Sequence, residues 1–282
     1  MLSYLHGFHA GNHADVFKHA VLTLLLDSLL AKPKPLVYLD SHAGAGRYDL
    51  TSEQARKTGE HAHGIGRLWP ARSAFPELAP YFAAIEALNQ EADCSRYPGS
   101  PAIARHLLRA DDRLVLMELH KAEVEGLREN LGQDQRVNIH YRDGFEGLPA
   151  LLPPKPARGL VLIDPPYEVK TDYTRVASCL IAAHARWPSG VYALWYPRLG
   201  VQRDQGESLL RRLAEHFPAL LVAELAVDSQ TDAFGMHASG MVMLNPPWQL
   251  DARLDKLLPA LTAVLATAPG RGGWRLEWLR RV

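Results

Sequence analysis

Cysteine is scarce in this chain, and neither sign of charge is in excess. Among 282 residues there are two cysteines, Cys94 and Cys179, which lie far apart and form no Cys-x-x-Cys pair. This scarcity argues against a disulfide framework or a zinc ribbon and favours a reducing compartment. The 31 Lys and Arg residues balance 31 Asp and Glu residues, so no overall field attracts polyanions. A nucleic-acid partner would therefore require a local basic surface.

Long apolar runs are also missing. The apolar stretch 21–30 is short and contains Asp27, so it cannot span a bilayer. The first six residues lack the basic segment with which a signal peptide begins. We therefore expect a cytoplasmic protein with no membrane partner.

Segments of strand length alternate with helical patterns through most of the chain. Asn12 and Asp15 predict the start of a helix that ends near Ala31. Strands are expected at 36–40, 112–119, 137–143, 159–165, 190–197, 220–228 and 240–244. Helices are expected between them at 102–109, 121–130, 145–152, 173–186, 206–217 and 250–266. This alternation predicts an α/β fold with a mainly parallel sheet, ending in an antiparallel pair and a final edge strand at 274–278.

A rigid acidic turn follows the apolar segment 159–163. Asp164 precedes Pro165, Pro166 and Tyr167, and because proline has no N–H to give to a sheet, strand pairing ends there. We expect an exposed lip at which the carboxylate and a free carbonyl accept both hydrogens of an exocyclic amine. Tyr167 would offer a ring on which a nucleobase stacks. Taken alone, the tetrapeptide is also compatible with an ordinary exit from a strand.

Acids also end the neighbouring strands. Asp40 leads into the glycine turn 44–46, Glu118 ends the next strand, and Asp143 closes the one after it. The carboxyl ends of parallel strands meet at one edge of a sheet, where the ligands of open α/β proteins bind. We therefore expect these acids to converge with Asp164 on a nucleoside site, although each alone is compatible with turn chemistry.

The spacing after the glycine turn predicts an insertion. In dinucleotide-binding folds an acid follows the glycines by about 20 residues, whereas Glu118 lies roughly 70 residues after Gly46. The surplus matches the stretch 51–97, which is polar at first, rich in Gly and Pro, and helical near 81–88. We interpret 51–97 as an inserted helical subdomain within a main domain of 1–50 and 98–282. A dehydrogenase would need a third glycine where Asp49 stands.

Other polar residues have two interpretations each. His9 and His13 could lie one helical turn apart, but the spacing of a known metal site is missing and we expect no metal. Lys18 is either a phosphate or substrate contact or a solvated helix lysine. The run 245–248, Asn-Pro-Pro-Trp, echoes the acidic turn but ends a strand away from the central crevice, so we interpret it as structural. Two interpretations, phosphate contacts and a solvated basic face, are equally compatible with the basic residues Arg47, Arg56, Lys57, Arg67 and Arg72.

Several segments together resemble one known family. They are Tyr4, Lys18-His19 and the runs 8–16, 39–48, 97–101 and 164–168. These closely resemble the bacterial ribosomal RNA large subunit methyltransferase J family, whose members methylate N6 of one adenine in 23S rRNA. The resemblance extends over essentially the whole chain, and its N-terminal part is highly specific.

The resemblance implies a Rossmann-like methyltransferase fold with helices on both faces, S-adenosylmethionine as cofactor, S-adenosylhomocysteine as product, and 23S rRNA as partner of a monomer. It assigns catalysis to Asp164 and an RNA contact to Tyr4. The helical insertion would serve RNA docking. Cofactor binding is assigned to His19, His42, Ser100, Glu118, Asp143 and Gly144.

The residues themselves indicate how such an enzyme would work. The Asp164 carboxylate and the Pro165 carbonyl would hold the two N6 hydrogens, and Tyr167 would receive a base that has left its stack. Four alternatives remain: guanine N2 of rRNA, adenine in DNA, a nucleotide-dependent oxidoreductase and a non-catalytic RNA-binding module. The missing third glycine disfavours the oxidoreductase, and an RNA-binding module leaves the converging acids unexplained.

Overall fold

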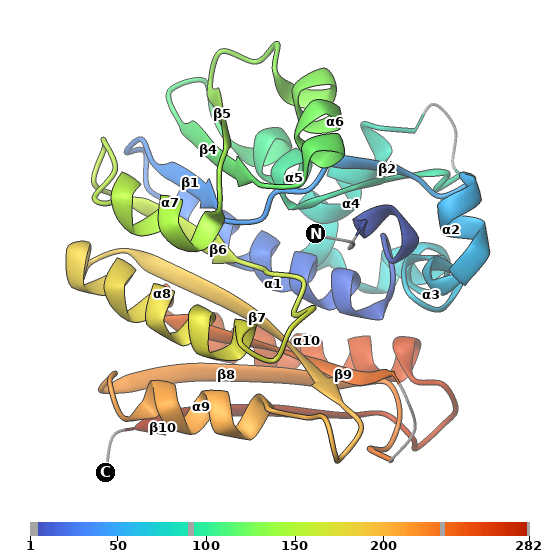
Figure 1. Ribbon diagram of the computed structural model, residues 1–282. Coiled ribbons are helices and arrows are strands. Elements are labelled where there is room, and N and C mark those ends of the chain that lie inside the picture. Colours follow the sequence, from blue (N-terminus) through green and yellow to red (C-terminus); the bar gives the residue numbers. More distant parts are fainter. Residues whose placement is uncertain (1–4, 90–92, 232–234, 281–282) are drawn as a thin grey trace.

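A computed structural model describes residues 5–89, 93–231 and 235–280 of the chain. Its main feature is an eight-stranded sheet in the order β10-β8-β9-β7-β6-β1-β4-β5 (Figure 1). Neighbouring strands from β7 to β5 in this order run parallel. They are β1 (Val37–Asp40), β4 (Arg113–Glu118), β5 (Val137–Tyr141), β6 (Gly159–Ile163) and β7 (Val191–Leu199). The predicted mainly parallel sheet is confirmed.

The other end of the sheet is antiparallel. β9 (Met236–Leu244) pairs antiparallel with both β7 and β8 (Ala219–Ala226). β10 (Gly273–Arg280) pairs antiparallel with β8 and forms the edge. The expected antiparallel pair and final edge strand are therefore confirmed. β9 lies between β7 and β8. It is therefore β9, the later strand of the antiparallel pair in the chain, that pairs with the parallel part of the sheet.

Side chains of β6 alternate between two hydrophobic cores. Leu160 and Leu162 belong to one core, whereas Val161 and Ile163 belong to the other. Because both faces of this strand are buried, its sequence is a continuous apolar run rather than an alternating one. Helices on both faces confirm the predicted Rossmann-like methyltransferase fold (Figure 1).

The helices divide between the two cores. The core of Leu160 contains side chains from α1 (His13–Leu30), α5 (Ser100–Leu107), α6 (Lys121–Leu131) and α10 (Leu250–Leu265). The core of Val161 contains side chains from α7 (Gly144–Leu151), α8 (Asp172–Arg186) and α9 (Gly206–Ala214).

Helix α1 is buried almost all round. Its N-terminus is capped by Asn12, whose side chain accepts a hydrogen bond from the Asp15 N–H at 2.9 Å. Every residue from 14 to 26 is buried, and these include Asp15, Lys18 and His19. Buried polar groups are costly unless they find partners. The contacts of these three side chains therefore define where α1 sits.

The stretch 51–97 is helical, as predicted. Its α-helices are α2 (Glu53–Thr58), α3 (Ile65–Leu68) and α4 (Ala79–Glu86), and its 3-10 turns are η2 (Glu60–His63), η3 (Trp69–Ala74) and η4 (Pro76–Leu78). The antiparallel strands β2 (Arg47–Asp49) and β3 (Arg96–Pro98) bracket it, and η1 (His6–Phe8) precedes α1. Leu68, Phe75 and Tyr81 pack into the same core as α1. Its division from the main domain stays a prediction.

The stretch meets the start of α1 through backbone atoms. The Ile65 N–H donates to the Gly11 carbonyl at 2.8 Å. A Cβ added to Gly64 would lie 2.1 Å from the same carbonyl oxygen and 2.4 Å from the Asn12 carbonyl carbon. Only glycine therefore fits where these two segments touch.

We expect Gly64→Ala to lower the free energy of unfolding by about 1–3 kcal/mol, because its methyl group would force two backbone segments apart. Gly273→Ala is the matched control, since a Cβ there meets no atom within 4 Å. Its effect should stay within about 0.5 kcal/mol. Denaturant unfolding followed by circular dichroism measures both values, and equal stabilities would contradict the close contact at Gly64.

Candidate active site

The carboxyl ends of the parallel strands open onto one cavity of about 900 Å³. β1 lies between β4 and β6, so the strand order reverses there, and ligands of open α/β sheets bind at such a point. Glu118, Asp143 and Asp164 lie at or just beyond the ends of β4, β5 and β6, and all three line the cavity. The predicted convergence of four strand-end acids on one site is confirmed for these three, whereas Asp40 does not line the cavity.

Asp40, at the end of β1, is fully buried. Its Oδ2 accepts hydrogen bonds from Ser100 Oγ and Tyr38 OH, both at 2.7 Å, and its Oδ1 accepts from the His42 N–H at 3.2 Å. Burial raises the pKa of Asp40 to about 6, although these hydrogen bonds favour the carboxylate. Asp40 thus holds Ser100 and the backbone of His42, two predicted cofactor contacts, at the cavity wall.

Glu118 ties the glycine turn to the end of β4. Its carboxylate accepts the Gly44 N–H at 2.8 Å and the His120 N–H at 2.7 Å. Burial raises the pKa of Glu118. The turn after β5 approaches the same region, because a Cβ on Gly144 would lie 1.9 Å from the Ser41 carbonyl oxygen. The predicted cofactor residues Glu118 and Gly144 are therefore held by backbone contacts.

Asp143 has two partners. It caps α7 by accepting the Phe145 N–H at 2.8 Å, and it accepts Arg175 Nη2 at 2.7 Å. The Arg175 guanidinium also lies 4.3 Å from the centre of the Phe145 ring. Burial opposes ionisation, but the hydrogen bond from Arg175 outweighs it and the pKa of Asp143 is lowered. Arg175 therefore braces this wall of the cavity.

The two predicted cofactor histidines are held by hydroxyl groups. His19 Nδ1 shares a hydrogen bond with Tyr97 OH at 2.8 Å, and His42 Nδ1 shares one with Ser41 Oγ at 2.7 Å. Burial lowers the pKa of His19 to about 3 and that of His42 to about 4. Both imidazoles are thus neutral near pH 7 and supply hydrogen bonds without charge.

The residues of this wall fit S-adenosylmethionine. Glu118 offers a carboxylate acceptor of the kind that holds ribose hydroxyls. Leu119 and Phe145 add apolar surface to the lining. Gly44, with φ 59°, adopts a conformation that lets a ligand approach the backbone. The cavity volume lies within the range of small-molecule sites.

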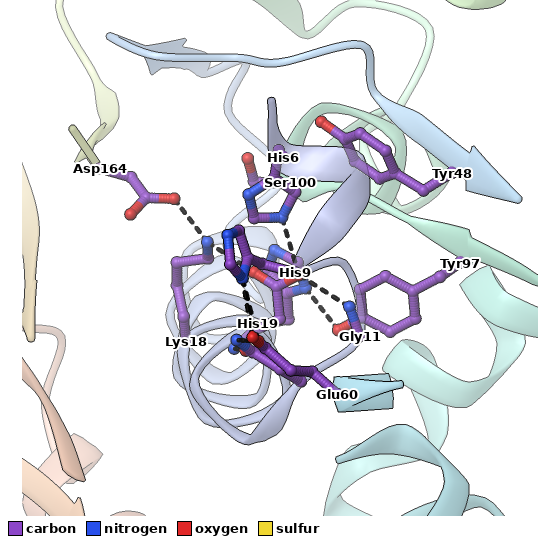
Figure 2. A network of polar contacts seen from close by, with 12 residues as sticks. His6, His9, Gly11, Lys18, His19, Tyr48, Glu60, Tyr97, Ser100 and Asp164 are labelled. Carbon is purple, nitrogen blue, oxygen red and sulfur yellow. Dashed lines mark hydrogen bonds and ion pairs between the residues drawn. The ribbon is translucent and has the colours of Figure 1, made fainter. Parts of the chain in front are cut away.

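Lys18 joins α1 to the acidic turn, as Figure 2 shows. Its Nζ lies 2.5 Å from Asp164 Oδ2 and 2.8 Å from Asp15 Oδ1. Burial disfavours the ammonium, but the two carboxylates outweigh it and raise the pKa of Lys18. The interpretation of Lys18 as a solvated helix lysine is therefore wrong, because the side chain is buried and paired. Its contact with substrate stays a prediction.

Asp15 completes this network on the other side of Lys18. Its Oδ2 accepts the Gly11 N–H at 2.9 Å and lies 2.8 Å from His6 Nε2. Burial opposes its ionisation, but the neighbouring His6 and Lys18 outweigh this and hold the pKa of Asp15 well below its usual range. The network thus runs from η1 through α1 to the end of β6 (Figure 2).

The acidic turn is partly enclosed, so the expectation of an exposed lip is wrong. The Asp164 side chain is 13% exposed and Pro165 is buried. Tyr167 adopts φ 51°, a left-handed conformation that is rare outside glycine. Its hydroxyl donates to the Trp195 carbonyl at 2.7 Å, and its ring centre lies 4.6 Å from that of Tyr173. Packing against β7 and α8 therefore encloses this turn, although Tyr167 also lines the cavity.

The cavity brings together every predicted site residue that the structure describes. Lys18, Pro165 and Tyr167 share it with Asp164 and the six predicted cofactor residues. Tyr4 lies outside the described residues. The sequence arguments missed the partners Asp15, Tyr97 and Arg175, although Asp15 could have been found from its spacing of three residues to Lys18 on one helix.

Three further points from the sequence concern the run 245–248, a metal site and a membrane-spanning helix. Run 245–248 follows the antiparallel strand β9, so it lies at the opposite edge of the sheet from the cavity, as expected. In the described ranges, His, Cys, Asp and Glu side chains form no group of three or more arranged for a metal ion. Among those same residues, no helix has the length and apolar character needed to cross a bilayer.

Comparison with known proteins gives consistent matches. The family model described as "Ribosomal RNA large subunit methyltransferase D, RlmJ" matches residues 33–280. Ribosomal RNA large subunit methyltransferase J of Escherichia coli K12 is 47% identical over 280 residues, which cover 99% of each chain. The protein of the same name from Haemophilus influenzae Rd is 47% identical over 281 residues, again 99% of each chain.

A solved structure is also similar over nearly the whole fold. A crystal structure of a Legionella pneumophila protein matches with a TM-score of 0.88 and 36% identity, covering 95% of this chain and 98% of that one. The fold described above is thus shared with this solved structure over nearly its whole length. The chain belongs to the ribosomal RNA large subunit methyltransferase J family.

Proposed function

We propose that this protein transfers a methyl group from S-adenosylmethionine to the N6 nitrogen of one adenine in 23S rRNA. Membership of a family of ribosomal RNA methyltransferases supports the broader activity, methyl transfer to rRNA. One observation carries the choice of an amino nitrogen. Asp164 and Pro165, a carboxylate beside a proline carbonyl, line the same cavity as Glu118 and Asp143.

The chemistry requires orientation more than activation. Bound S-adenosylmethionine supplies a methyl group that its positive sulfur already activates. The lone pair of adenine N6 is delocalised into the ring, so the protein must turn it toward that methyl group. The Asp164 carboxylate and the Pro165 carbonyl accept the two N6 hydrogens and favour a pyramidal nitrogen.

Asp164 also receives the proton. As the bond from N6 to the methyl carbon forms and the bond from that carbon to sulfur breaks, positive charge develops on N6. Asp164 then takes one N6 proton as general base. Lys18 fixes Oδ2 of Asp164 at 2.5 Å, which leaves Oδ1 for the amine. The target adenine reaches this position by leaving its stack, and the Tyr167 ring receives it.

The stretch 51–97 contributes the RNA-facing side of this cavity. Glu60, His63 and Arg67 belong to it and line the cavity together with the α1 residues. We propose that this stretch docks the RNA and that the protein acts as a monomer in the cytoplasm. A docking role would also account for the presence of the insertion, which the sheet itself does not require.

Transfer of labelled methyl groups to 23S rRNA that lacks the modification tests the proposal. Nucleoside analysis of the product should show N6-methyladenosine. N2-methylguanosine as the product, or labelling of DNA instead of rRNA, would replace adenine N6 of rRNA as the substrate. No labelling of any nucleic acid would remove the proposed activity.

We expect Asp164→Ala to lower kcat by at least about 100-fold, because the reaction loses its general base. Cofactor affinity should change by less than about threefold, since Lys18 keeps its pairing with Asp15 at 2.8 Å and the cofactor residues lie on other strands. Single-turnover methylation and calorimetry measure the two quantities. Asp255→Ala, an exposed acid on α10, is the control. Equal losses of rate and cofactor affinity would contradict the assigned role.

Glu118→Ala should weaken cofactor binding by about 10- to 100-fold, since hydrogen bonds to a charged group contribute about 1.5–3 kcal/mol. Glu125→Ala removes an exposed acid from the neighbouring helix α6 and should leave the dissociation constant unchanged. Titration calorimetry with S-adenosylhomocysteine gives both constants. An unaltered constant for Glu118→Ala would remove this residue from the cofactor site.

The buried neutral His19 predicts a loss of stability in acid. Its native pKa of about 3 lies below the ordinary 6.5, so below pH 6.5 the unfolded chain binds a proton that the folded chain does not. From pH 7 to pH 5 the wild type should therefore lose on the order of 1–2 kcal/mol more stability than His19→Gln. Denaturant unfolding at both pH values measures this, with the exposed His216→Gln as control. Parallel losses in wild type and His19→Gln would show that His19 is not buried neutral.

A further inference from the structure

A second hollow adjoins the candidate active site. It has a volume of about 740 Å³ and lies between the C-terminal part of α10, the loop 266–272 and the start of β10. We call it the α10 groove, and its walls include Arg67, Pro259, Thr262, Thr267, Pro269 and Trp274. Arg67 and Thr267 line the active-site cavity as well, so the groove and the cavity meet at these two residues.

Trp274 gives the groove an aromatic wall. Its side chain stands on the edge strand β10 and is 44% exposed. An exposed indole face is the kind of surface on which a nucleobase stacks without regard to its identity. The groove therefore offers a binding surface that the proposed reaction has not used.

Thr262 adds a polar group that lacks a partner. The residue is 7% exposed, and within the described chain no hydrogen-bond partner reaches its Oγ1. A threonine inside a helix commonly donates to a carbonyl of the preceding turn. Leaving such a hydroxyl buried and unpaired is costly, because it has lost its hydrogen bonds to water. A bound ligand that reaches this hydroxyl would remove that cost.

Arg67 supplies positive charge where the groove meets the cavity. One nitrogen of its guanidinium, Nη1, donates to the Leu265 carbonyl at 3.0 Å and to the Ala266 carbonyl, at the end of α10. These bonds hold the planar group in a fixed orientation and leave further N–H groups for an anion. One acid lies near this point: Asp228 accepts a hydrogen bond from the Thr267 hydroxyl. Its negative charge is paired with Arg271 at 2.7 Å.

We propose that the α10 groove binds the nucleotide next to the target adenosine in the RNA strand. Its base stacks on Trp274, the Thr262 hydroxyl hydrogen-bonds to it, and the phosphate that joins it to the target lies at Arg67. When the target base leaves the helix, its neighbour loses a stacking partner, and Trp274 replaces that partner. This inference rests on the proposed function, because it requires a flipped-out target in the adjoining cavity.

Methylation kinetics on paired protein and RNA variants test the groove. The substrate is a 23S rRNA fragment around the mapped target, and two further versions carry an abasic nucleotide on its 5′ or its 3′ side. For the wild type, one of these abasic versions should raise KM for RNA about tenfold. Trp274→Ala should raise KM for intact RNA about tenfold, and the same abasic RNA should then cause no further rise. The kcat at saturating RNA and the cofactor affinity should stay unchanged.

Matched variants separate stacking from a general loss of structure. Trp278→Ala removes a tryptophan of the same strand that is 39% exposed, donates to Asp251 and does not line the groove, so its KM should equal that of the wild type. Trp274→Phe keeps an aromatic face and should retain most of the affinity. Thr262→Val keeps the shape of the side chain without the hydroxyl and should raise KM by about fivefold.

The results distinguish failure of the groove from failure of the reaction. If the wild type methylates rRNA but Trp274→Ala and Thr262→Val leave KM and the abasic response unchanged, the α10 groove does not bind the neighbouring nucleotide. If the effects of Trp274→Ala and the abasic nucleotide simply multiply, base and indole are not in contact, and the inference also fails. If the wild type methylates no RNA, the proposed function is the part that is lost.

Discussion

The ammonium group of Lys18 lies between two carboxylates that come from distant parts of the chain. Asp15 belongs to its own helix, whereas Asp164 follows β6, 146 residues later. Removing three charges from water is costly, and only close pairing offsets that cost. The raised pKa of Lys18 and the lowered pKa of Asp15 indicate that attraction outweighs burial here. Helix α1 is therefore held against the end of β6 by charge as well as by apolar packing.

This arrangement makes α1 the common support of both halves of the site. Lys18 contacts the acid that we assign to catalysis, and the next residue, His19, which we assign to cofactor binding, bonds to Tyr97. A shift of the helix would therefore move both groups together and preserve their spacing. The Gly64 contact with the start of α1 extends this support to the stretch 51–97. An enzyme whose task is to orient its substrates gains from having Lys18 and His19 on one rigid helix.

Much of the fold could be predicted from the sequence because its signals are local. The apolar run 159–163 predicts a strand buried on both faces, and an acid at its end lies at the carboxyl edge of any parallel sheet. Helical periodicity shows which residues share a face of α1, but it does not show what that face meets. The pairing of Lys18 with Asp164 therefore could not be predicted from the sequence, and a solvated lysine was an equally reasonable interpretation. The enclosed state of Tyr167 could not be predicted either, because its hydroxyl bonds to Trp195, 28 residues later, and its left-handed backbone turns the ring toward Tyr173.

Four acids that occupy equivalent positions along their strands have different surroundings. Asp40 is sealed beneath Ser100 and Tyr38 and its pKa rises to about 6, whereas Asp143 is paired with Arg175 and its pKa falls. Position along the strand therefore does not decide the surroundings of each acid; the neighbouring residues do, here from β1, α5 and α8. The same principle applies to RNA binding by a chain without net charge. Because no overall field draws in the polyanion, affinity must come from local groups, and we assign this part to Trp274 and Arg67, which line the same groove.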